Sequence, residues 1–257
     1  MMISGKKFAI TGANRGIGLA VAEVAAARGS HLILAGRSFQ IEEQERLKSL
    51  GAASVHFIKC DLSTHEGVDS LGSELQKLEV DILFNNAGLL TGGLLEEQSL
   101  DDIDSMFQVN VVALVHLTRA VLPGMIQRGC GKIINNSSVS AYMHFPCAST
   151  YAASKAAVLA FTNCMEAELI GTGVSTLCLI TPGVKTRMFD EIEMKYGKNL
   201  ETPKDTISPA AYAEQIASAI EADQSQLYPG GSTAWGLWVA RYLGPLFRRA
   251  VKERFKR

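Results

Sequence analysis

The sequence predicts an α/β protein in which a parallel, doubly wound sheet forms a single domain. Short buried apolar runs alternate with helical segments along most of the chain, and a glycine-rich turn joins the first run to the first helix. Polar residues follow the runs at their carboxyl ends, where such sheets bind ligands. The chain has 257 residues, 47% of them hydrophobic, which suits one large core.

The apolar runs and the segments between them give the expected elements in order. Runs bounded by turn residues are expected to be strands, and segments with three-and-four apolar spacing are expected to be helices. The strands are expected at 7–11, 31–35, 55–59, 80–84, 132–136 and 174–180, with a short last strand near residue 228. The helices are expected at 19–28, 39–50, 66–78, 100–128, 151–160 and 209–222.

The turn after the first strand has the glycine spacing G-x-x-x-G-x-G. Between a strand and a helix, such glycines let the backbone approach a pyrophosphate, whose charge is attracted by the helix N-terminus. The alternative is an ordinary tight turn. We expect a dinucleotide to contact the residues of this turn, which are Gly12, Asn14, Arg15, Gly16, Ile17 and Gly18.

The end of the second strand predicts which dinucleotide binds. A carboxylate at this place would accept the 2′-hydroxyl of NAD, but the chain has Gly36 and Arg37 instead. Arg37 and Arg15 together suit a 2′-phosphate, because arginine binds phosphate through paired donors. The sequence therefore favours NADP(H), although Arg37 could also be a solvated loop residue.

Two further segments follow strands and are expected beside the cofactor. Asp61 follows the third strand, where it could accept a hydrogen bond from an adenine amino group, cap the next helix, or do both. Asn86, Ala87 and Gly88 follow the fourth strand, and their small size fits a backbone that passes close to a cofactor. The alternative for this second segment is a plain turn.

Three polar side chains predict a site for proton transfer. Tyr151 and Lys155 are four residues apart and share one face of a helix, with the ammonium expected to lower the pKa of the phenol. Ser138 follows the fifth strand and could bind the oxygen of a reacting carbonyl or alcohol. The Tyr-x-x-x-Lys spacing alone also occurs by chance on solvated helix faces.

Asn110 lies in an apolar stretch in the middle of the predicted 100–128 helix. A buried amide is costly unless it is hydrogen-bonded. Asn110 is therefore either a satisfied core amide or an anchor for water or for Lys155.

The ordered set of motifs resembles the short-chain dehydrogenase/reductase family, from the start of the chain to about residue 183. The matching residues are 11–18, Asp61, 85–88, Asn110, Ser138, Tyr151, Lys155, Pro182 and Gly183. This resemblance implies a Rossmann-type domain without a metal, and commonly a homodimer or homotetramer that pairs the helices of Asn110 and Tyr151.

The resemblance also implies a role for each catalytic residue. Tyr151 would be the general acid/base, and Lys155 would lower its pKa and bind the nicotinamide ribose. Ser138 would orient the substrate oxygen, and Asn110 would hold a water in a proton relay through Lys155. Pro182, Gly183 and Thr186 would contact the nicotinamide, although in many members the threonine comes one residue later.

The rest of the chain is expected to determine the substrate. Residues 184–208 are interpreted as a lid on a catalytic domain at 1–231. Met188 and Phe189 in this lid suit a hydrophobic substrate, or pack on the body of the domain.

Residues 232–257 form an amphipathic tail, which Gly244 and Pro245 are expected to break into two helices. From Arg241 onward the tail has seven basic residues against the single acid Glu253, a local excess of plus six. This composition is typical of a helix at a membrane surface, and we expect possible peripheral contact through 235–257. The alternatives are packing beside the substrate cleft or at a subunit interface.

The predicted function is an NADP(H)-dependent oxidoreductase that interconverts a ketone or aldehyde and an alcohol. The expected substrate is hydrophobic, either steroid-like or lipid-like. The alternative is a non-catalytic NADP(H)-binding sensor or scaffold on the same fold. The net charge of −1 predicts no nucleic-acid partner, and the five scattered cysteines predict a reduced, cytoplasmic protein that is peripheral at most to a membrane.

Overall fold

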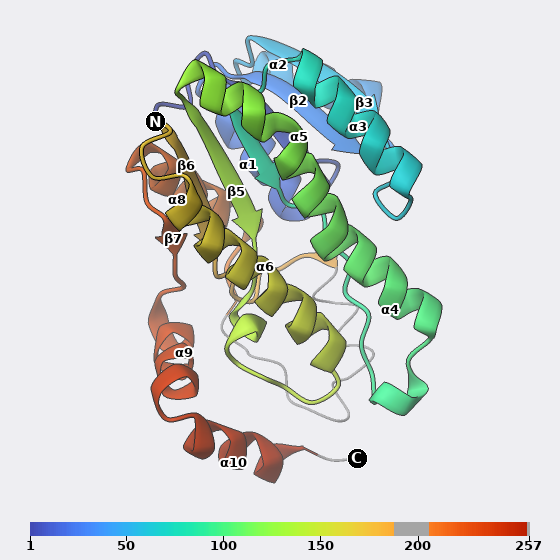
Figure 1. Cartoon of the computed structure of the whole chain (residues 1–257), viewed down its shortest axis with the longest axis vertical. Helices are drawn as coiled ribbons and strands as arrows, with labels where there is room; N and C mark the ends of the chain where they lie inside the picture. The colour runs from blue at the N-terminus through green and yellow to red at the C-terminus, as the bar shows by residue number, and fades with distance from the viewer. Residues whose placement is uncertain (188–205, 256–257) are drawn as a thin grey trace.

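The structure is a computed structural model that describes residues 1–187 and 206–255. Within these residues, parallel strands form a seven-stranded sheet of order β3-β2-β1-β4-β5-β6-β7 (Figure 1). The strands are β1 (Lys7–Thr11), β2 (His31–Gly36), β3 (Ser54–Lys59), β4 (Ile82–Asn85), β5 (Gly131–Asn136), β6 (Val174–Leu179) and β7 (Gln226–Leu227). The predicted fold class is therefore confirmed, and the strand bounds differ from the predicted ones by a few residues at most.

Helices cover both faces of the sheet, as expected for a doubly wound fold. One face is covered by α1 (Gly16–Ala27), α2 (Ile41–Ser49) and α8 (Pro209–Glu221). The other is covered by α3 (His65–Lys77), α5 (Ala113–Arg128) and α6 (Ser149–Glu168).

The side chains of the strands alternate between these two layers. Phe8 and Ile10 of β1 belong to the cluster under α1 and α8, whereas Ala9 between them belongs to the cluster under α3 and α5. Leu32 and Ile33 of β2 divide in the same way. Because both faces are buried, these strands appear in the sequence as continuous apolar runs.

The predicted 100–128 helix contains a π-helical turn. It consists of α4 (Leu100–Phe107), the π turn η2 (Gln108–Val112) and α5, and Asn110 lies in the turn. π turns are frequent at functional sites. Within the described residues, Leu100–Arg128 is the one helix long and apolar enough to cross a membrane by length and composition, and its buried side chains pack against the sheet.

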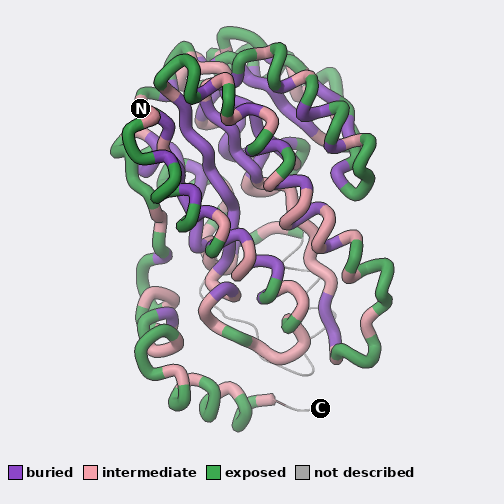
Figure 2. Tube along the Cα trace, in the orientation of Figure 1, coloured by how far each residue is buried: buried purple, intermediate pink, exposed green. Residues whose placement is uncertain are grey.

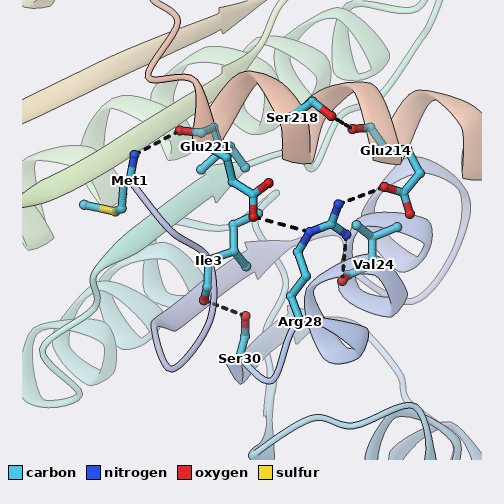
Figure 3. A network of polar contacts seen from close by, with 9 residues as sticks. Met1, Ile3, Val24, Arg28, Ser30, Glu214, Ser218 and Glu221 are labelled. Carbon is cyan, nitrogen blue, oxygen red and sulfur yellow. Dashed lines mark hydrogen bonds and ion pairs between the residues drawn. The ribbon is translucent and has the colours of Figure 1, made fainter.

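A network of polar contacts ties the start of the chain to α8 (Figure 3). Arg28, just after α1, pairs with Glu214 at 2.9 Å and with Glu221 at 3.4 Å. The amino group of Met1 donates to the carbonyl of Ile220 at 3.3 Å. These contacts hold α8 against α1.

The tail forms two helices, α9 (Gly231–Tyr242) and α10 (Gly244–Arg254), so the predicted break is confirmed. Leu237 on α9 is buried in a small cluster with Ala141, and Phe247 on α10 contacts Phe145 edge to face at 5.8 Å. Figure 2 shows that the rest of both helices is largely exposed. They lie at the end of the molecule to which β5 points (Figure 1).

Candidate active site

A cleft of about 820 Å³ opens at the carboxyl ends of the strands. This volume suits a cofactor together with a small substrate. The cleft brings together most of the residues predicted from the sequence, which are Gly12, Asn14, Arg15, Gly16, Ile17, Arg37, Asp61, Asn86, Ala87, Gly88, Ser138, Tyr151, Lys155, Pro182, Gly183 and Thr186.

The remaining predicted residues lie elsewhere. Gly18 and Asn110 lie behind the cleft and support its wall through contacts with Asn86 and Leu89. Met188 and Phe189 lie outside the described residues. The two ends of the predicted lid meet in a parallel bridge between Val184 and Ile207.

The glycine-rich turn packs so closely on the segment after β4 that side chains would not fit. Gly12 has φ +64°, and a Cβ on it would lie 2.9 Å from Ala87 Cα. A Cβ on Gly18 would lie 2.5 Å from the carbonyl oxygen of Gly12. Asn86 donates to the carbonyl of Thr11 at 2.9 Å, which fixes the two segments together.

The N-terminus of α1 faces the cleft and provides an anion site. Arg15, the N-cap residue, has extended backbone and makes no side-chain cap, so the first amides of α1 remain available for a phosphate. Thr186 lies against this turn, with its methyl carbon 3.3 Å from the Cβ position of Gly16. The lining residues thus fit a dinucleotide.

Asp61 organises the turn that follows β3. Its carboxylate accepts hydrogen bonds from the amide of Ser63 at 3.0 Å and the hydroxyl of Ser63 at 2.7 Å, and these bonds lower the pKa of Asp61. Thr64, not Asp61, caps α3 by accepting from Gly67. Arg37 is close enough to contribute to the lowered pKa of Asp61.

Ser138, Tyr151 and Lys155 lie on one wall of the cleft. Ser138 follows β5 and accepts from the amide of Ser140 at 3.1 Å. Tyr151 lines the same wall, with the Ser138 hydroxyl close enough to lower its pKa, and Lys155 Nζ lies 5.7 Å from the centre of the tyrosine ring. A carbonyl oxygen placed between the two hydroxyls would meet two donors.

The pKa of Tyr151 differs from the prediction. Burial raises it to about 12, and the hydrogen bond to Ser138 offsets this only in part. Burial also lowers the pKa of Lys155 to about 8. The expectation that Lys155 lowers the pKa of Tyr151 is therefore wrong for this arrangement, because desolvation dominates for both groups.

Asn136 connects the site to its surroundings and was not singled out in the sequence. Its carbonyl accepts from Lys155 Nζ at 2.7 Å. Its side chain donates to Asn86 at 3.2 Å and accepts from Thr181 at 2.5 Å, and Thr181 is bonded to Tyr212 at 3.0 Å. An amide at the end of a buried strand was the available signal.

Asn110 is a satisfied amide. It donates to the carbonyl of Leu89 at 2.9 Å and to Ser154 at 3.0 Å, and it accepts from the amide of Leu89 at 2.8 Å. Its side chain therefore ties the segment after β4 to α6, which carries Tyr151. Of the two interpretations from the sequence, the satisfied core amide fits Asn110, because its side chain is bonded to Leu89 and Ser154 and not to Lys155.

Replacing Lys155 with methionine is expected to stabilise the protein at pH 7 by up to about 3 kcal/mol. The folded pKa of about 8 lies below the usual 10.5, so folding disfavours the charged form. The free-energy cost of folding with a buried Lys155 is absent above pH 10.5. It grows as the pH falls from 10.5 to 8 and is constant below pH 8. Chemical denaturation across this pH range measures it.

Lys132 provides the matched control, because it is also buried but pairs with Asp223 at 2.6 Å. Lys132→Met should destabilise the protein, since it removes both the ion pair with Asp223 and the hydrogen bond to the carbonyl of Gln224. If Lys155→Met lost as much stability at pH 7 as Lys132→Met does, burial of the charged Lys155 side chain would not be destabilising, which would contradict the expectation.

Comparisons with known proteins agree with this geometry. Residues 6–197 match the short chain dehydrogenase family. The oxidoreductase YusZ of Bacillus subtilis is 34% identical, over 84% of this chain and 78% of its own. The fatty acyl-CoA reductase of Acinetobacter baylyi is 33% identical, over 85% and 74%.

A solved structure has the same overall fold. A short-chain dehydrogenase of Sphingobium yanoikuyae in complex with NADPH is 25% identical, with a TM-score of 0.79 over 98% of this chain and 97% of that chain. These matches agree with the cleft, the glycine turn and the wall formed by Ser138, Tyr151 and Lys155 in assigning the chain to a family. It belongs to the short-chain dehydrogenase/reductase family, whose oxidoreductases act on carbonyl and alcohol groups with a nicotinamide cofactor.

Proposed function

We propose that the protein reduces a hydrophobic ketone or aldehyde with NADPH and that Tyr151 donates the proton. The observation that carries this proposal is the position of Tyr151, Ser138 and Lys155 together on the wall of a cleft that the glycine turn also lines. NADPH, when bound, supplies the hydride for the carbonyl carbon. The chain supplies the proton and the donors that polarise the carbonyl oxygen.

The raised pKa of Tyr151 suits its proposed role as the proton donor in ketone reduction. With a pKa of about 12, the hydroxyl is protonated at neutral pH and ready to donate. Oxidation of an alcohol would require the phenolate, which burial disfavours. Lys155, whose pKa is about 8, is placed behind the tyrosine to return a proton. We therefore expect the oxidation of alcohols to require a more alkaline pH than the reduction of ketones.

The apolar part of the cleft supports a hydrophobic substrate. Leu89, Leu90, Val139, Phe145 and Pro146 line it near the catalytic wall. The name of the Acinetobacter relative, a fatty acyl-CoA reductase, points to the same class of substrate. A panel of long-chain and polycyclic ketones, with small polar ketones as controls, tests this preference through NADPH absorbance. Equal kcat/KM for polar and apolar ketones would contradict it, and NADPH binding without turnover would favour the sensor or scaffold alternative.

Arg37→Ala is expected to weaken NADPH binding by about 10- to 100-fold and to leave NADH binding nearly unchanged. Arg37 lines the cleft at the end of β2, where no carboxylate accepts the ribose of NAD. Arg46→Ala, on α2 and paired with Glu23, is the control and should bind both cofactors as the parent does. Calorimetric titration with each cofactor measures the preference, and an unchanged NADPH-to-NADH ratio in Arg37→Ala would refute this role.

We also propose that two copies associate through α5 and α6. These helices cover the same face of the sheet (Figure 1), and α6 has exposed alanines at 153 and 160. Ala153→Arg and Ala160→Arg should each shift the sedimentation coefficient toward that of a single chain.

A further inference from the structure

The tail helices expose a row of aromatic side chains on the face opposite their buried side. Trp235, Trp238 and Tyr242 on α9 are 71%, 51% and 62% exposed, and their rings follow one another at 6.1 and 5.7 Å. Their i, i+3, i+7 spacing places them on one side of the helix. Leu237 on the other side is 5% exposed and packs on the body. We call these three residues the aromatic stripe.

Exposed cations follow on α10, the next helix of the tail. Arg248, Arg249 and Lys252 are exposed, and the one acid on the helix, Glu253, pairs with Arg249 at 3.1 Å. Leu246, at the start of α10, is 58% exposed and adds apolar surface to the tail. The chain as a whole has a net charge of −1, so this positive surface is local to the tail.

An anionic lipid surface fits this combination of side chains. Tryptophan and tyrosine rings favour the boundary between headgroups and hydrocarbon, and clustered arginine and lysine bind anionic lipids. A second copy of this chain fits less well, because association through this face would bring like charges together.

We propose that the aromatic stripe and the cations of α10 dock the protein on an anionic bilayer surface. α10 also touches the cleft, since Phe247 contacts Phe145, which lines the cleft wall. Docking would therefore hold this part of the cleft wall near the lipid. Access of bilayer-dissolved substrates to the cleft is a consequence that rests on the proposed function.

Vesicle binding of the full-length protein, measured without substrate, tests the docking separately from turnover. The protein should sediment with vesicles of phosphatidylcholine and phosphatidylserine and much less with phosphatidylcholine alone. The double variant Trp235→Ala/Trp238→Ala should bind about tenfold more weakly. Ile170→Ala, which alters a residue that is 83% exposed on the body, is the matched control and should bind as the parent does.

The contribution of the α10 cations to vesicle binding is tested with two double variants, one on α10 and a control on the body of the protein. Arg248→Gln/Lys252→Gln should lower binding to the anionic vesicles by roughly 25-fold, since each cation near such a surface contributes about fivefold. Lys48→Gln/Lys77→Gln removes two exposed cations from α2 and α3 and should have little effect. Equal losses in both pairs would overturn the proposal.

Measuring the oligomeric state shows whether the aromatic stripe binds a lipid surface or a second copy of the protein. The stripe variant and the parent should have the same sedimentation coefficient in solution. A fall in mass confined to Trp235→Ala/Trp238→Ala would show that the stripe is a subunit interface and would overturn docking on lipid.

Discussion

Tyr151→Phe is expected to lower kcat by about a thousandfold while NADPH affinity stays within about twofold of the parent. The substitution removes a single oxygen from the cleft wall. That oxygen is the proposed proton donor, whereas the ring keeps its place near Lys155. Even with its pKa raised to about 12, the phenol is a stronger acid than water, so water entering the cleft is a poor substitute for it. Steady-state kinetics with a turned-over ketone and calorimetry with NADPH measure the two effects.

Tyr142→Phe is the matched control for this substitution. Tyr142 lies outside the cleft, where Arg241 sits over its ring at 5.5 Å, and phenylalanine keeps that contact. Its kcat should equal that of the parent. Near-normal turnover in Tyr151→Phe, or an equal loss in both variants, would remove Tyr151 from its role.

Gly18→Ala is expected to weaken NADPH binding by about 10- to 100-fold. The added Cβ would lie 2.5 Å from the backbone carbonyl oxygen of Gly12 and 2.6 Å from the side-chain nitrogen Nδ2 of Asn86. The first atom is backbone, and the Asn86 side chain is held by its hydrogen bond to the carbonyl of Thr11, so the glycine turn would have to move away from the segment after β4. That movement would displace the first turn of α1, where the phosphates are expected.

Gly230→Ala is the control, because its added Cβ would have nothing within 4 Å. Thermal unfolding of both variants shows whether they are folded before calorimetry with NADPH. If folded Gly18→Ala binds NADPH as tightly as Gly230→Ala does, the close packing of the glycine turn is not required for the cofactor.

The sequence predicted the fold because its signals are local. A buried strand between two helical layers gives a continuous apolar run, as at 31–35, and glycines between a strand and a helix give the turn at 12–18. The predicted wall of Ser138, Tyr151 and Lys155 is assembled as expected. The four-residue spacing on α6 aligns Tyr151 with Lys155, and Ser138 comes from the segment after β5.

What the sequence did not reveal depends on contacts between distant segments. Asn136 binds Asn86 and Thr181, which are 50 and 45 residues away, and only the strand register brings them together. The π turn at Asn110 interrupts a pattern that predicted one helix. The direction of the pKa shift of Tyr151 depends on how deeply its hydroxyl is buried, which spacing along a helix does not report.

The most direct test of the central claim is to follow the hydride itself. NADPH carrying deuterium at both C4 positions is incubated with the protein and a ketone that it consumes, and the alcohol is analysed by mass spectrometry. We predict that the alcohol carries a single deuterium on its carbinol carbon and that equimolar NADP⁺ forms. Oxidation of NADPH without label in the alcohol, or no oxidation with any ketone of the panel, would contradict the account.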